Sequence, residues 1–331
     1  MHPYKPATGF QQYICAMSDT LKTFTDMRIV FMGTPEFAVA SLDALVQAGC
    51  TIAGVVTAPD KPAGRGMKLN ESAVKKYALE KHLYILQPEK LKDKNFLSQL
   101  AALKADVQVV VAFRMLPEVV WNMPPMGTIN VHASLLPQYR GAAPINWAVI
   151  HGEKETGVTT FKLKHEIDTG NILLQQKLII GDDENAGELH DRMKVAGAEL
   201  LVKTIKAISD GTAAESPQVI IEGVGKHAPK IFTETCCIHW DKSCDEIYNL
   251  IRGLSPYPGA FSYLNNKMLK IYKAKKEITV HNYAAGSVHS DGKTFLKYAC
   301  ADGFIHCTEI QPEGKKKMNV EDFLRGWRGE A

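Results

Sequence analysis

Residues 106–112 form a nearly continuous apolar run, Asp-Val-Gln-Val-Val-Val-Ala, which constrains the fold more than any other feature of the chain. A strand this apolar is typical of one buried on both faces of a parallel sheet. Two other strand-like runs, at 28–32 and 51–57, precede it, and each is followed by a segment with helical spacing. Because strands that alternate with helices form a parallel sheet, the sequence predicts an α/β domain.

The turn after the first strand has clear chemical signals. Gly33 ends the strand, Thr34 is expected to be the N-cap of the next helix, and Pro35 is expected to be its first residue. The turn lacks the second and third glycines of G-x-G-x-x-G. Dinucleotide binding is therefore disfavoured.

The chain changes character after residue 232. Ser243 and Glu246 predict a capping box at the start of a short helix that ends at Gly253. Short strand-like runs separated by turn dipeptides follow, a pattern typical of a small barrel. The expected strands are 260–264, 268–272, 294–299 and 304–310. We therefore predict a disordered extension at 1–26, a first domain at 27–220, a linker at 221–231 and a C-terminal β-barrel domain at 232–331.

Composition excludes several classes of protein. The 331 residues carry 39 basic and 36 acidic side chains, a net charge of +3, too small for a strongly basic nucleic-acid or membrane binder. No apolar run approaches the roughly 20 residues that cross a bilayer. The 7 cysteines make no C-x-x-C pair, which favours a reduced cytoplasmic protein. A zinc site at Cys236, Cys244 and a histidine is less favoured than plain thiols, because the spacing is irregular.

Polar residues interrupt apolar structure between 130 and 168. Asn130 and His132 lie two apart at the end of an expected strand, so their side chains leave the same face. Ligands of open α/β sheets bind beyond the carboxyl ends of the strands. Together with Asp168, these residues can supply an oxyanion donor, a proton acceptor and a group that orients it. Taken alone, such residues are more often parts of turns or cores.

Several separated motifs resemble the signature of the folate-dependent formyltransferases. They are Asn-x-His-x-Ser-Leu-Leu-Pro-x-x-Arg-Gly at 130–141 and Ile-Asp-Thr-Gly at 167–170. Gly-Thr-Pro at 33–35, the loop 59–66 and Gly-Ala-Ala-Pro at 141–144 are similar to the branch that acts on methionyl-tRNA. The resemblance covers residues 27–325. It implies a Rossmann-like formyltransferase domain joined to an OB-like β-barrel that binds tRNA.

The resemblance also implies an activity. The formyl group of 10-formyltetrahydrofolate would pass to the α-amino group of methionyl-initiator-tRNA, for translation initiation, with no metal ion. It places the catalytic roles on Asn130, His132 and Asp168. It places the folate pocket at Phe113, Arg114, Met115, Leu116, Ser134, Leu135, Leu136 and Pro137. Because segment 113–117 is one residue shorter than in many relatives, the contacts to the pterin stay open.

Basic residues are candidates for contact with tRNA. Lys61, Arg65 and Lys68 lie in what is expected to be a mobile loop, and the resemblance implies that this loop approaches the acceptor stem. Five lysines between 267 and 276, with 315–317, are further candidates for phosphate contact. Solvated surface is the alternative interpretation, because the same domain holds nearly as many acidic residues.

Other functions remain open at this point. The same trio of residues would serve formyl transfer to a small amine, such as an amino sugar, or hydrolysis of the formyl-folate. A catalytically silent tRNA-binding protein is an alternative of another class. We expect a monomer with no membrane contact.

Overall fold

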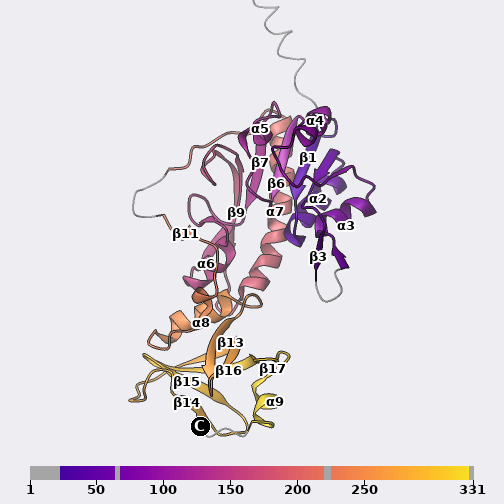
Figure 1. Ribbon diagram of the computed structural model, residues 1–331. Helices are drawn as coiled ribbons and strands as arrows, with labels where there is room; N and C mark the ends of the chain where they lie inside the picture. Colours follow the sequence, from indigo (N-terminus) through magenta and orange to yellow (C-terminus); the bar gives the residue numbers. More distant parts are fainter. Residues whose placement is uncertain (1–22, 64–67, 220–224, 328–331) are drawn as a thin grey trace, which may run out of the picture.

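The computed structural model describes residues 23–63, 68–219 and 225–327, which form two domains stacked end to end (Figure 1). Most of the expected disordered extension, residues 1–22, lies outside this description. Residues 23–26 form a turn, in which the Asp26 amide donates to the Thr23 carbonyl over 3.0 Å. Within the described ranges, no helix is long and apolar enough to cross a membrane.

The first domain is built on a seven-stranded sheet with the order β10-β9-β7-β6-β1-β2-β5. The predicted parallel sheet is confirmed for the five strands from β7 to β5, whereas β9 and β10 are antiparallel additions at one edge. The strand predicted to be buried on both faces is β6, and all five of its residues are buried. The strands are β1 (Arg28–Gly33), β2 (Thr51–Val56), β5 (Ile85–Leu86), β6 (Val107–Val111), β7 (Thr128–His132), β9 (Glu155–Lys162) and β10 (Ile172–Ile179).

Helices cover both faces of this sheet. Alternate residues of β1 and β6 enter two separate cores, with Phe31 and Val109 on the side of α2 and α7, and Met32 and Val110 on the side of α4 and α5. This alternation explains why the strands are apolar throughout. The helices are α2 (Glu36–Gln47), α3 (Ala73–Glu80), α4 (Lys94–Ala102), α5 (Glu118–Trp121), α6 (Pro144–Ile150) and α7 (Ala186–Ser209).

The first turn differs from the prediction by one residue. Pro35 is the N-cap of α2, without a side-chain cap, and Glu36 is the first helical residue. Pro35 is extended, with ψ 176°, so the helix begins only after it. Gly33 is needed for close packing, because a Cβ there would lie 2.6 Å from the Ala38 Cβ.

The expected mobile loop after residue 59 contains strands. β3 (Lys61–Ala63) and β4 (Lys68–Asn70) pair as a hairpin that projects from the domain (Figure 1). Asp60 anchors its base by binding the Lys75 ammonium and the Gln87 amide, the latter over 2.8 Å. The hairpin is therefore fixed to the domain at its root.

The second domain confirms the predicted β architecture, with an antiparallel, curled, OB-like sheet. The expected strand 268–272 is the first half of a longer strand, β13, and β14, β17 and the last helix were not predicted. The capping box of Ser243 and Glu246 is confirmed. The elements are η1 (Glu234–Cys236), α8 (Cys244–Gly253), β12 (Ala260–Leu264), β13 (Lys267–Ile278), β14 (Val288–Ser290), β15 (Leu296–Cys300), β16 (Gly303–Pro312), β17 (Met318–Asn319) and α9 (Val320–Leu324).

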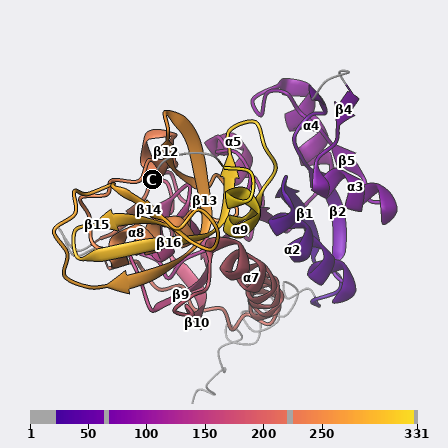
Figure 2. The ribbon, with the colours of Figure 1, turned by 90° about the horizontal axis from the view of Figure 1, so that it is seen from below.

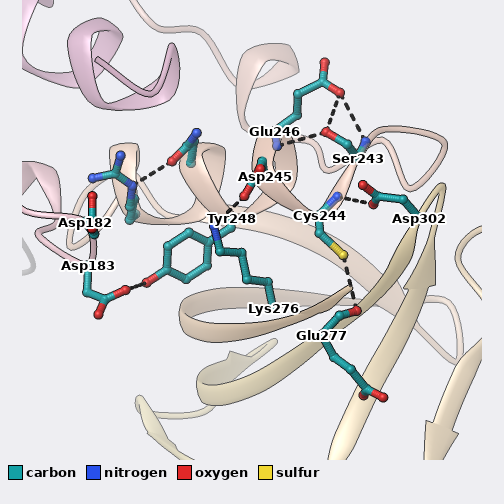
Figure 3. A network of polar contacts seen from close by, with 12 residues as sticks. Asp182, Asp183, Ser243, Cys244, Asp245, Glu246, Tyr248, Lys276, Glu277 and Asp302 are labelled. Atoms are coloured by element: carbon teal, nitrogen blue, oxygen red, sulfur yellow. Dashed lines mark hydrogen bonds and ion pairs between the residues drawn. The ribbon is translucent and has the colours of Figure 1, made fainter. Parts of the chain in front are cut away.

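Helix α8 holds the two domains together. The Tyr248 hydroxyl donates to Asp183 over 2.7 Å, and the Cys244 amide donates to the Asp302 carboxylate within the second domain over 2.7 Å (Figure 3). Arg252, only 5% exposed, donates to the Glu184 carbonyl over 2.9 Å. From below, the second domain lies under the β9–β10 side of the first sheet, with α3 and α4 on the other side (Figure 2).

Candidate active site

The site begins where β7 ends. His132 is the last residue of β7 and is 8% exposed, and Asn130 leaves the same face of the strand. Ile129 and Val131, on the opposite face, pack into the core against α7. The alternation of the strand thus directs two polar side chains away from that core at the carboxyl edge of the sheet.

The imidazole of His132 has a different partner at each nitrogen. Its Nε2 lies 2.9 Å from the carbonyl oxygen of Tyr139, and its Nδ1 lies 3.8 Å from Oδ2 of Asp168. A carbonyl oxygen only accepts hydrogen bonds, so Nε2 carries a hydrogen. The nitrogen that faces the carboxylate is therefore the one available for proton exchange.

The carboxylate of Asp168 is held by a backbone amide of another segment. Oδ2 accepts a hydrogen bond of 3.0 Å from the Gly141 amide, and the residue has φ +54°. Gly170, two residues later, lies so close to β9 that a Cβ would come within 1.7 Å of the Lys162 carbonyl oxygen. The Ile-Asp-Thr-Gly motif therefore has a structural reason for its glycine: a tight approach that places the carboxylate beside the imidazole.

Asn130 differs from these two residues. Its side chain is half-buried, and within the described parts of the chain its amide makes no hydrogen bond to protein. Polar groups at a buried edge are normally paired. This amide is consequently free to donate to a ligand beside the His132 imidazole.

Side chains of β9 and β10 hold the segment Ser134–Pro137 by hydrogen bonds to its backbone carbonyls. The Thr159 hydroxyl donates to the Ser134 carbonyl over 2.6 Å, and the Gln175 amide donates to the Leu136 carbonyl over 3.0 Å. Ser134 is fully buried and its hydroxyl donates to the Gln138 carbonyl, while Leu136 is 3% exposed. These two side chains shape the segment from within, and the half-buried Leu135 and Pro137 remain nearer its surface.

The expected folate segment Phe113–Leu116 follows β6, the neighbour of β7, and so lies at the same edge of the sheet. Leu116 is buried, whereas Met115 is 69% exposed. The guanidinium of Arg114 donates to the carbonyls of Pro88 and Glu89, the second over 2.8 Å. Arg114 thus ties this segment to the loop after β5.

The candidate tRNA residues are only partly described. Lys61 is exposed in β3, Lys68 begins β4, and Arg65 lies outside the described residues. In the second domain, Lys270 donates to the Pro258 carbonyl and Lys276 pairs with Asp245. No ion pair involves the exposed Lys267, Lys273 or Lys275 within the described ranges.

Around Cys244 the structure brings together other residues than those of the zinc site considered from the sequence. The thiols of Cys244 and Cys300 lie 3.2 Å apart, and a carboxylate oxygen of Asp302 is within 4.8 Å of both. Cys236 and a histidine are not part of this group, the one such cluster among the described residues. The Asp302 carboxylate already accepts the Cys244 amide at the start of α8, so the group has a structural role.

Comparison with known proteins gives matches in both domains. Residues 27–205 match the family model "Formyl transferase", and residues 230–328 match "Formyl transferase, C-terminal domain". The chain belongs to the formyl transferase family. A methionyl-tRNA formyltransferase of Bacteroides fragilis is 52% identical over 91% of this chain and 95% of its own length. One from Flavobacterium johnsoniae is 52% identical over 91% of this chain and 96% of its own length.

A solved sugar 3N-formyl transferase shares the fold of this formyl transferase. The two agree with a TM-score of 0.65 at 21% identity, over 88% of this chain and 99% of the other. At that identity the likeness concerns the fold alone.

The residues that sequence motifs did not single out are those that brace the site, chiefly Tyr139, Thr159 and Gln175. Tyr139 lies inside the Asn-x-His motif as a variable position, so only its place in the motif pointed to it.

Proposed function

We propose that this formyl transferase passes the formyl group of 10-formyltetrahydrofolate to the α-amino group of methionyl-initiator-tRNA, with Asn130, His132 and Asp168 as catalytic residues. The observation that carries the proposal is the imidazole of His132, fixed at Nε2 and facing Asp168 with Nδ1. The Asn130 amide leaves the same strand face and has no protein partner among the described residues. The tRNA as acceptor is supported by relatives at 52% identity that are named for it.

The reaction forms one carbon–nitrogen bond and breaks another. The methionine nitrogen attacks the formyl carbon, and negative charge develops on the formyl oxygen. The Asn130 amide donates to that oxygen, a contribution on the order of 3 kcal/mol for one preorganised donor. Collapse of the tetrahedral intermediate breaks the bond from the formyl carbon to N10 of the folate, which becomes tetrahydrofolate.

One proton must move from the attacking nitrogen to the leaving nitrogen. Nδ1 of His132 is the nitrogen that exchanges it, because Nε2 keeps its hydrogen in the bond to the Tyr139 carbonyl. The Asp168 carboxylate, 3.8 Å away, stabilises the imidazolium that this exchange forms. The Gly141 amide holds the same carboxylate oxygen in place.

The test is formylation by the purified full chain. Charged initiator tRNA and 10-formyltetrahydrofolate should yield formyl-methionyl-tRNA, measured in a single turnover, with elongator methionyl-tRNA as the comparison acceptor. An amino sugar and water, as alternative acceptors, should give far slower release of the formyl group. Absence of product above a no-enzyme control rejects the proposal.

Contact with tRNA belongs to the basic residues Lys61, Arg65 and Lys68, and to exposed lysines of β13. Phosphate contacts of this kind weaken as salt rises. Arg65→Ala should raise the KM for methionyl-tRNA and leave the KM for the folate unchanged. Unchanged KM values for both substrates would exclude Arg65 from tRNA recognition.

We propose that the protein is a monomer and that it acts in the cytoplasm. Each domain has its own core of buried apolar residues, as a chain that folds without a partner subunit requires. Light scattering during gel filtration should give the mass of one chain, 36.6 kDa. A dimer mass at micromolar concentration would contradict the monomer.

A further inference from the structure

The chain that connects the two domains contacts segments next to the proposed catalytic residues, on both sides of residues 220–224. Gln218 approaches the Asp168 turn from one side, and Lys226–Ala228 approach the segment Tyr139–Gly141 from the other. These contacts lie outside the proposed reacting atoms. They bear on the distance between the His132 imidazole and the Asp168 carboxylate.

The side-chain amide of Gln218 is satisfied at both ends. Its Nε2 donates to the carbonyls of Asp168, over 2.9 Å, and Gly170, over 2.7 Å. Its Oε1 accepts from the Arg140 guanidinium, over 3.1 Å from Nε and also from Nη2. One amide thereby joins the turn that carries Asp168 to the residue between Tyr139 and Gly141.

The segment 139–141 holds both catalytic groups. The Tyr139 carbonyl binds Nε2 of His132, and the Gly141 amide binds Oδ2 of Asp168. A shift of this segment against the Asp168 turn would change the distance between imidazole and carboxylate. Arg140, between the two, is the point at which Gln218 fixes the segment.

The connector braces the segment from its other side as well. β8 (Arg140–Gly141) pairs in parallel with β11 (His227–Ala228), and the Tyr139 amide donates to the Lys226 carbonyl over 2.6 Å. Glu153 binds both the Tyr139 hydroxyl, over 2.6 Å, and the Lys226 ammonium. A Cβ on Gly141 would lie 2.4 Å from the Ala228 oxygen, so this pairing requires glycine.

We infer that the interdomain connector is part of the support of the active site, and that Gln218 is a positioning residue for the His132–Asp168 pair. Its amide sets the Asp168 turn against the segment that fixes the imidazole. This inference rests on the proposed roles of His132 and Asp168. It assigns the connector a task beyond joining two domains.

The decisive variant is Gln218→Glu, which keeps the shape of the side chain and the bond to Arg140. It removes both donors and sets a carboxylate oxygen against the carbonyls of Asp168 and Gly170. We expect kcat to fall about 10- to 100-fold, with the KM values for folate and tRNA within about twofold of the starting values. Gln218→Ala should lower kcat in the same direction, and Gln47→Glu, on the far end of α2, is the charge-matched control.

A second readout is independent of turnover. In the starting protein labelled with ¹⁵N-histidine, the ring shifts of His132 at pH 8 should be those of a single tautomer protonated at Nε2. Gln218→Glu should move the Nδ1 resonance, and Gln47→Glu should leave it in place. Thermal unfolding within about 3 °C of the starting protein would show that the variant is folded.

The outcomes separate the inference from the proposed function. If the starting protein fails to formylate methionyl-tRNA, the proposed function fails, whatever the variants do. If it formylates and Gln218→Glu retains its kcat and its Nδ1 shift, the inference is wrong. A rise in KM for tRNA alone would also overturn it, because the connector would then act only in binding.

Discussion

The two domains place the polar side chains of their candidate sites in opposite ways. In the first domain, His132, Ser134, Thr159 and Asp168 are buried at one edge of a sheet, and each is hydrogen-bonded to a backbone group. In the second, apolar and cysteine side chains fill the core, while Lys267, Lys273 and Lys275 are exposed. Chemistry on a carbonyl needs fixed donors in a dry place. Attraction of a polyanion needs only accessible charge.

The largest effect on turnover should come from the buried polar residues of the first domain. His132→Ala or Asp168→Ala should lower kcat by about 10²- to 10⁴-fold, the usual size of a lost general acid–base group. Because both side chains are buried and hydrogen-bonded, thermal unfolding of each variant must show that it is folded at the assay temperature. The matched control is His165→Ala, an exposed histidine three residues before Asp168. Turnover near the starting value in the first two variants would place the chemistry elsewhere.

Two glycines give an equal test in each domain. A Cβ on Gly170 would lie 1.7 Å from the Lys162 oxygen, and one on Gly303 would lie 2.0 Å from the Glu277 oxygen. Each alanine variant should lose about 1–3 kcal/mol of unfolding free energy through overpacking. Gly170→Ala should also lower kcat, whereas Gly303→Ala should chiefly raise the KM for tRNA. Chemical denaturation and steady-state kinetics measure the two effects, and a kcat loss confined to Gly303→Ala would reverse the comparison.

The exposed lysines of the second domain should make the KM for methionyl-tRNA depend on salt. Lys273→Ala with Lys275→Ala should raise the KM for methionyl-tRNA about 3- to 10-fold and leave kcat nearly unchanged. The slope of log KM against log salt should fall by about 1 for each phosphate group that no longer has a lysine partner. Lys154→Ala, which breaks an exposed ion pair with Asp182, is the control for charge. An unaltered slope would remove β13 from the tRNA surface.

The smallest expected effect concerns a core thiol. Burial raises the pKa of Cys50 from its ordinary 9.0 to about 11, so little thiolate is present at pH 8. Alkylation by iodoacetamide should be slow in the native protein and fast in urea. Because the pKa is higher in the folded state, this group favours folding below pH 9 and the benefit is lost as pH rises towards 11. Rapid native labelling at pH 8 would contradict the buried environment.

The predicted place of Asn130 and His132 at the end of one strand is confirmed, because spacing alone carries that information. Asn130 and His132 are two apart on a strand, and strand geometry puts them on one face. The Ser243–Glu246 capping box was also predictable, since its partners are three residues apart. β9 and β10 were not predicted, and their antiparallel direction depends on pairing with distant segments.

By itself, the sequence determined the alternation of strands and helices, the β character of the second domain and the identity of the family. These follow from local periodicity and from motifs whose residues are close in the chain. Only the tertiary structure decided which nitrogen of His132 faces Asp168, and that residues before and after 220–224 brace the pair. Those facts depend on hydrogen bonds between segments separated by up to about 90 residues in the chain. The relative positions of such segments are fixed only when the cores on both faces of the sheet have packed.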